Sequence, residues 1–128
     1  MDAHEYLVSL IPQPQEVRAF TDAASDANSG WTFDGELGWV HCEASLADGV
    51  DGSKTYYRYE SDGARKVVNF PDEPCRIHTY GNSFTHCDQV SDGETWQEYL
   101  AAHFQEPLRN YGVGGYSVYQ AYLRMLRV

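Results

Sequence analysis

The apolar positions of the first thirty residues follow the spacing of a helix. Val17, Phe20 and Ala24 recur at helical intervals after Pro14, a residue favoured in the first turn of a helix. Residues 28–30, with the sequence NSG, are typical of a helix end. We therefore expect one helix with a structural role in this segment.

From Trp31 to about Phe70 the pattern changes to that of strands. Residues 54–59 (KTYYRY) are rich in β-forming residue types, and Asp62 and Gly63 form a turn pair before residues 64–68 (ARKVV). This pattern predicts a small β-rich leader. Residues 48–52 (DGVDG) lack the alternating oxygen ligands and terminal Glu of an EF-hand, so a surface turn is favoured over a calcium loop.

The pattern after residues 71–74 (PDEP) predicts a first unit of strand, loop and helix. The strand is residues 76–80 (RIHTY), and Ser91 and Glu94 stand at capping-box spacing before the helix. One face of this helix is expected to carry Trp96, Tyr99, Leu100, His103 and Phe104.

A second unit of the same kind follows. Residues 107–111 (PLRNY) predict a strand, and Ser117 and Gln120 repeat the capping-box spacing before a helix with Tyr122, Leu123 and Leu126. Two β-α units in succession are the ordering of a parallel α/β sheet. Because two parallel strands bury little and the apolar pattern continues to Val128, we expect the sheet to be incomplete. We divide the chain into a helix plus β-rich leader (1–74) and two β-α units of a truncated domain (75–128).

Composition narrows the classes of function. The chain has 128 residues, 42% of them hydrophobic, and a formal net charge of −10. This length and apolar content suffice for one buried core. An acidic chain repels phosphate backbones and anionic lipids, so we expect neither nucleic acid nor a membrane surface as partner.

The sequence carries no sign of secretion. Its first residues (MDAHE) contain no basic region, and the apolar run 6–11 is too short for a signal peptide or a membrane span. Cys42, Cys75 and Cys87 are an odd number without a Cys-x-x-Cys pair, which favours reduced thiols. We expect a cytoplasmic protein by default.

Two loops carry the candidate chemistry. Residues 81–85 (GNSFT) follow the first predicted strand and residues 112–115 (GVGG) follow the second, and ligands of open α/β sheets bind beyond the carboxyl ends of strands. A serine hydroxyl becomes a good nucleophile when a base removes its proton, and a glycine loop lets backbone N–H groups approach a developing oxyanion. The pair of loops therefore points to acyl transfer.

These loops resemble those of a known family. Residues 81–85 are similar to block I of the SGNH (GDSL-type) serine hydrolases, and residues 110–116 (NYGVGGY) are similar to block II. Residues 90–96 (VSDGETW) are also typical of many members, so the resemblance covers residues 76–128. Residues 36–40 and 61–65 resemble, more weakly, a β-rich leader of some bacterial members. The resemblance implies a three-layer flavodoxin-like α/β fold, here with an incomplete parallel sheet.

The resemblance also implies roles for individual residues. Ser83 is the expected nucleophile of an acyl-serine mechanism, and its N–H and that of Gly115 are expected to form part of the oxyanion hole. The substrate is then a small acyl ester or an acylated carbohydrate, the acyl-serine passes its acyl group to water or to a sugar acceptor, and no cofactor is needed. The family's further oxyanion Asn and its Asp and His lie on later blocks that this chain does not contain. Removal of one oxyanion donor costs about 10²–10³ in rate, so we expect the isolated chain to be nearly inactive.

Departures from known patterns bear on the class of hydrolase. Asn82 replaces the Asp that is common in the family, which removes a charge but keeps a similar hydrogen-bonding shape. Thr85 stands where the nucleophile elbow of α/β-hydrolases requires a second glycine, so that class is disfavoured.

Structural roles are open alternatives for the same residues. Ser83 is also a suitable helix cap, and Gly112 and Gly114 are more readily explained by a tight turn. His86 is too close to Ser83 in sequence to align as its base. The pairs His41-Cys42 and His86-Cys87 do not have the spacing of a zinc site, so no metal is expected.

A second hypothesis for the whole chain is a non-catalytic binding or assembly module, or a decayed fragment. Such a module would use aromatic side chains at the sheet rim for carbohydrate or protein contact, namely Tyr80, Tyr111, Tyr116 and Tyr119.

Overall fold

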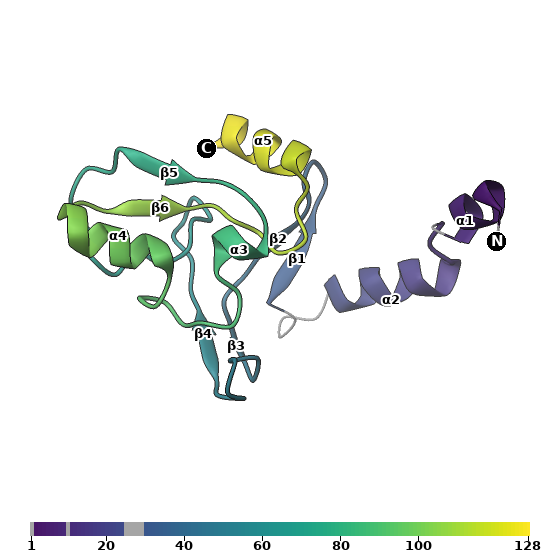
Figure 1. Cartoon of the computed structure of the whole chain (residues 1–128), viewed down its shortest axis with the longest axis horizontal. Coiled ribbons are helices and arrows are strands. Elements are labelled where there is room, and N and C mark those ends of the chain that lie inside the picture. Colours follow the sequence, from purple (N-terminus) through teal and green to yellow (C-terminus); the bar gives the residue numbers. More distant parts are fainter. Residues whose placement is uncertain (1, 10, 25–29) are drawn as a thin grey trace.

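The computed structural model describes residues 2–9, 11–24 and 30–128, and its architecture is mixed α/β with small sheets (Figure 1). Helices α1 (Ala3–Ser9) and α2 (Pro14–Ala24) extend away from the other elements (Figure 1). Helix α2 confirms the helix expected after Pro14. Most of its expected end, at residues 28–30, lies outside the described residues.

The leader is β-rich, as its pattern predicts. Strands β1 (Trp31–Asp34) and β2 (Gly38–His41) form an antiparallel hairpin, and β3 (Ala44–Leu46) pairs antiparallel with β4 (Thr55–Tyr57). The predicted strand at residues 64–68 is reduced to one bridge, between Tyr59 and Arg65. Residues 48–53 form a surface turn, in which the Gly49 N–H donates to the Ser53 carbonyl at 3.1 Å.

The second half contains the two expected β-α units. Strands β5 (Ile77–Thr79) and β6 (Leu108–Asn110) pair in parallel, with Ile77 opposite Leu108. Helices α3 (Ser83–His86) and α4 (Trp96–Phe104) connect them, and α5 (Val118–Arg127) follows β6. In the described residues this parallel sheet has two strands, and the flavodoxin-like fold stays a prediction.

One of the two predicted capping boxes is present. The Ser117 hydroxyl accepts from the Gln120 N–H at 3.3 Å, and the Gln120 side chain accepts from the Ser117 N–H at 3.0 Å. In α4 the N-cap is Thr95, so the prediction of Ser91 as cap is wrong. The Ser91 hydroxyl instead accepts from the backbone N–H of Tyr56 at 3.1 Å, so this side chain hydrogen-bonds to β4.

The aromatic side chains expected on one face of α4 are exposed to solvent. Trp96, Tyr99 and Phe104 are 42%, 72% and 51% exposed, and the inner face carries Gln97, Glu98 and Ala101. Polar side chains occupy the inner face because they hydrogen-bond to backbone groups that are not paired within a strand. The Glu98 carboxylate accepts from the N–H groups of residues 68 and 69 at 3.0 and 2.8 Å, and the Gln97 amide donates to the carbonyl of residue 85 at 2.8 Å.

An apolar cluster joins the leader to the loop after β6. Leu37, Val113 and Tyr116 are buried together, and the partly buried Trp39, Val40 and Leu123 pack against them. None of the described helices is both long enough and apolar enough to cross a membrane.

Candidate functional site

The serine loop presents Ser83 in the first turn of α3. Asn82 is the N-cap, and its side-chain oxygen accepts from the Phe84 N–H at 3.1 Å. The alternative in which Ser83 itself caps the helix is therefore wrong. The Ser83 hydroxyl makes no hydrogen bond to any residue in the described part of the chain. Gly81 is required here because a Cβ at this position would lie 2.2 Å from the Thr85 hydroxyl oxygen.

A pocket of about 390 Å³ opens beside the serine. It is lined by Asp48, Ser83, Phe84, Asp88 and Gln89. Burial has the largest single influence on Asp88 and opposes its charge, but the hydrogen bond from His86 and the electrostatic influence of His86, His41 and Arg65 together lower the pKa of the carboxyl. The pocket is therefore acidic at neutral pH.

The glycine loop packs directly on the serine loop. The Val113 N–H donates to the Gly81 carbonyl at 3.0 Å. A Cβ at Gly112 would lie 2.3 Å from the backbone nitrogen of His86, so this glycine serves close backbone packing. Gly115 is exposed, with φ +79, and its nearest neighbour is the Trp39 ring. The fold thus joins the two loops, but the pocket beside Ser83 does not include Gly115.

Strand β2 holds the glycine loop through neutral side chains. The Trp39 indole N–H donates to the Gly114 carbonyl at 2.9 Å, and the Gly114 N–H donates to His41 Nε2 at 3.1 Å. The other His41 nitrogen, Nδ1, lies 3.1 Å from the Gly30 carbonyl, so His41 is neutral with its proton on Nδ1. Burial and the neighbouring His86 lower the pKa of His41 from 6.5 to about 4.

Arg65 holds the segment that follows Ser83. Its buried guanidinium donates to the carbonyls of His86 at 2.6 Å and Cys87 at 2.8 Å, and also to that of Val90. Its Nε lies 3.3 Å from the buried carboxylate of Asp92. The leader therefore contacts both candidate loops.

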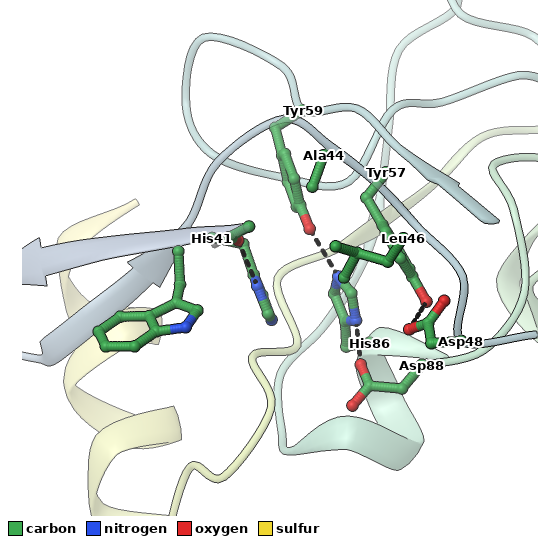
Figure 2. A pocket seen from close by; sticks show the side chains of 10 residues that line it. His41, Ala44, Leu46, Asp48, Tyr57, Tyr59, His86 and Asp88 are labelled. Atoms are coloured by element: carbon green, nitrogen blue, oxygen red, sulfur yellow. Dashed lines mark hydrogen bonds and ion pairs between the residues drawn. The ribbon is translucent and has the colours of Figure 1, made fainter. Parts of the chain in front are cut away.

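The side chain of His86 is buried, and its ring stacks against those of His41, Tyr57 and Tyr59 of the leader (Figure 2). Its Nδ1–H donates to Asp88 at 2.5 Å, and the Tyr59 hydroxyl donates to its Nε2 at 2.9 Å. A cavity of about 140 Å³ lies beside this cluster. Both ring nitrogens are engaged, which agrees with the rejection of His86 as the base.

His41, His86 and Asp88 bring possible metal-ligand atoms within 4.8 Å of one another. However, the two rings are stacked, with centroids 4.1 Å apart and an interplanar angle of 22°, so their in-plane lone pairs do not converge. Each ring's lone pair already accepts a hydrogen bond. We therefore interpret the group as a hydrogen-bonded cluster. Sequence reasoning missed it because no local spacing links β2 to α3.

Two further histidines, His78 and His103, lie outside this hydrogen-bonded cluster. His78 is exposed on β5, 3.4 Å from the Tyr80 hydroxyl, and His103 is exposed near the end of α4.

The structure also corrects the aromatic rim of the binding-module hypothesis. Tyr111 and Tyr116 are only 3% and 5% exposed, whereas Tyr119 is 67% exposed.

Comparison with known proteins gives no relative for this chain: no family model, curated protein or solved structure matches it. The family resemblance of residues 81–85 and 110–116 therefore stays a proposal.

Proposed function

We propose that this chain carries the nucleophile side of an SGNH-type serine esterase site, which acts on ester or O-acyl bonds. In this reaction the Ser83 oxygen attacks the acyl carbon, the alcohol leaves with a proton, and water then releases the acid from the acyl-serine. The observation that carries the proposal is the Ser83 hydroxyl, which lines a pocket of about 390 Å³ and makes no hydrogen bond to a described residue. Because Asn82 already caps α3, this hydroxyl is not needed as the helix cap.

Two backbone donors support the same role. Neither the N–H of Ser83, at the start of α3, nor that of the exposed Gly115 donates a hydrogen bond to a described residue. Unpaired N–H groups are the donors that an oxyanion hole requires. Their loops are joined through the Val113 N–H and the Gly81 carbonyl.

The base is the missing component among the described residues. His41 and His86 already use both ring nitrogens, and the remaining described histidines, His4, His78 and His103, lie on α1, β5 and α4. We propose that the proton acceptor comes from residues outside this described set. The chain by itself is then expected to react slowly through Ser83.

An active-site phosphonate with added imidazole tests this proposal. Imidazole replaces the missing base, so we expect it to accelerate formation of a phosphonate adduct at Ser83, located by peptide mass spectrometry. Ser83→Ala should abolish the adduct and Ser91→Ala should not, because Ser91 lies outside the pocket. The absence of a Ser83 adduct with imidazole present, or equal labelling of other serines, would contradict the proposal.

The binding or assembly module has separate support in the exposed apolar residues. On α4 these are Trp96, Tyr99 and Phe104, and on α5 they are Tyr119, Tyr122, Met125 and Leu126. Exposed apolar groups of this extent are typical of interaction surfaces. A chain that lacks Ser83 labelling but associates through these helices in sedimentation experiments would favour this second function.

A further inference from the structure

The hydrogen-bonded cluster around His86 contains a hydroxyl, an imidazole and a carboxylate in series. The Tyr59 hydroxyl donates to His86 Nε2 at 2.9 Å, and His86 Nδ1–H donates to Asp88 Oδ1 at 2.5 Å (Figure 2). This order of groups lets a histidine remove the proton of a nucleophile while the carboxylate orients the ring. All three side chains line the cavity of about 140 Å³, and Ser83 does not.

The surroundings of His86 keep its ring neutral and able to accept a proton. Burial lowers the pKa of His86, the Asp88 carboxylate opposes this shift, and the Arg65 guanidinium adds to it. Asp92 also opposes the shift, and the stacked ring of His41 is neutral. At neutral pH His86 is therefore an unprotonated base, with its remaining proton on Nδ1 beside Asp88.

The hydroxyl of Tyr59 differs from that of Tyr57, which lines the same cavity. Burial raises the pKa of Tyr59, so the phenol keeps its proton until His86 removes it during attack. The Tyr59 oxygen accepts no hydrogen bond from a described residue, which leaves a lone pair for a new bond. The Tyr57 hydroxyl instead donates to Asp48 at 2.8 Å and accepts from the Gln89 N–H at 2.8 Å. Because a carboxylate is a weaker base than an imidazole, Tyr57 is a matched comparison.

The size and lining of the cavity limit the group that it can accept. A volume of about 140 Å³ holds only a small group, and Ala44 and Leu46 provide apolar walls. The carboxylates of Asp48 and Asp88 disfavour an anionic group. The Asp88 side chain is 42% exposed, so small molecules in solution reach the cluster at this residue.

We propose that Tyr59, His86 and Asp88 form a second nucleophilic site, at which the Tyr59 oxygen takes up a small uncharged acyl group. The Tyr59 oxygen attacks the acyl carbon, and the bond from this carbon to the leaving group breaks. The phenolic proton passes to His86 Nε2 and then to the leaving group, so a tyrosine ester remains. Asp88 stays hydrogen-bonded to His86 Nδ1–H throughout.

Acetylation of the whole chain by N-acetylimidazole tests this proposal. The Tyr59 oxygen replaces imidazole on the acetyl carbon, and the departing imidazole takes the proton. Peptide mass spectrometry after short reaction times gives the rate at each tyrosine. A positioned base contributes about 10²–10⁴-fold to a rate, so at pH 7 we expect Tyr59 to react at least about tenfold faster than Tyr57. Absence of acetylation at Tyr59, or equal rates at the two tyrosines, would overturn the proposal.

The pH dependence separates catalysis by His86 from the ordinary reactivity of a phenol. An exposed phenol reacts as the phenolate, so the rate at Tyr119 should rise about tenfold for each pH unit between about pH 7 and 8.5. The rate at Tyr59 should stay constant over this range, because His86 is already unprotonated. The ratio of the two rates within each sample cancels the hydrolysis of the reagent. Parallel rates at Tyr59 and Tyr119 would contradict the role of His86, and this measurement needs no variant.

Variants test the same assignment residue by residue. Tyr59→Phe should remove the acetylated site. His86→Gln keeps an acceptor for the Tyr59 hydroxyl but is no base, so it should lower the Tyr59 rate at pH 7 about tenfold or more. His103→Gln, at an exposed position near the end of α4, should leave the rate unchanged. An unchanged Tyr59 rate in His86→Gln would show that His86 is not the base.

This site and the proposed Ser83 site can fail separately. Ser83→Ala should leave acetylation of Tyr59 unchanged, since Ser83 does not line the cavity. Loss of Tyr59 acetylation in Ser83→Ala would show that the acyl group arrives by way of Ser83, and the independent site would be overturned. Acetylation of Tyr59 without any phosphonate adduct at Ser83 would keep this site and remove the serine esterase.

Discussion

The serine loop and the glycine loop meet at the same end of the β5–β6 pair, but the leader holds them by different chemistry. The segment after Ser83 is held by the buried cation of Arg65, which donates to a set of backbone carbonyls. The glycine loop is held by the neutral rings of Trp39 and His41. We call Arg65 the charged anchor and Trp39 with His41 the neutral anchor. The stability given by the charged anchor requires all of its hydrogen-bond partners, whereas the stability given by the neutral anchor depends on pH and on the close packing of the glycine loop.

Loss of the charged anchor should have the largest effect. Arg65→Ala leaves buried carbonyls without a donor and removes one partner of the buried Asp92 carboxylate. We expect the free energy of unfolding in urea to fall by about 3–5 kcal/mol, as when one partner of a buried ion pair is removed.

Arg58→Ala is the matched control, because Arg58 contacts the same Asp92 carboxylate, at 2.8 Å, from a side chain that is 59% exposed. Its effect should be much smaller. Equal effects of the two variants would show that Arg65 is not a specific anchor.

The neutral anchor should weaken in acid. His41 has its pKa lowered from 6.5 to about 4, so between these values the unfolded chain binds a proton that the folded chain does not. Its contribution to stability is complete above pH 6.5 and is lost as the pH falls towards 4, and its size is on the order of 3 kcal/mol.

Urea unfolding from pH 7 to 4.5 measures this loss. His41→Gln keeps an acceptor for the Gly114 N–H and should flatten the pH dependence, whereas His103→Gln at an exposed site should not. A His41→Gln curve parallel to that of the wild type would show that His41 is not the titrating anchor.

Close packing of the glycine loop should have an intermediate effect. In Gly112→Ala the new Cβ would lie 2.3 Å from the His86 nitrogen and 2.7 Å from the Thr85 carbonyl carbon. Overpacking of this kind costs about 1–3 kcal/mol. Gly35→Ala is the control, since nothing lies within 4 Å of its Cβ position. Thermal unfolding of both variants checks this difference, which should vanish if the two loops are not in backbone contact.

The helix cap after the glycine loop should have the smallest effect. Ser117→Ala removes one half of the capping box of α5 and should cost about 1 kcal/mol of unfolding free energy. Ser83→Ala should change stability very little, because its hydroxyl makes no hydrogen bond to a described residue. A cost for Ser83→Ala equal to that for Ser117→Ala would assign Ser83 a structural role.

Local patterns predicted the elements of the fold better than their faces. The α2 helix, the turn at residues 48–53, the parallel β-α units and the Ser117 capping box all follow from residues close in sequence. The inner face of α4 could not be predicted in this way. Glu98 is buried because the backbone of residues 68 and 69 needs an acceptor, which is a contact between distant segments.

The same limit applies to the candidate site. The serine and glycine loops were evident from residue type and order, but the roles of Ser83 and Gly115 stay predictions. Trp31, His41 and Arg65 were not predicted, because each acts across the interface between the leader and the later loops. A hydrophobic pattern does not report which backbone carbonyl an arginine will reach.

The Arg65 anchor has a consequence for the order of events during synthesis. The ribosome makes the leader before residues 86–92, so the guanidinium has none of its carbonyl partners when it leaves the exit tunnel. At the usual rate of translation this interval lasts about a second or more, which is long compared with the closure of a short loop. The leader therefore gains its Arg65 anchor only after the segment that follows the serine loop has been made, and a released chain truncated before residue 86 would leave this guanidinium without its carbonyl partners.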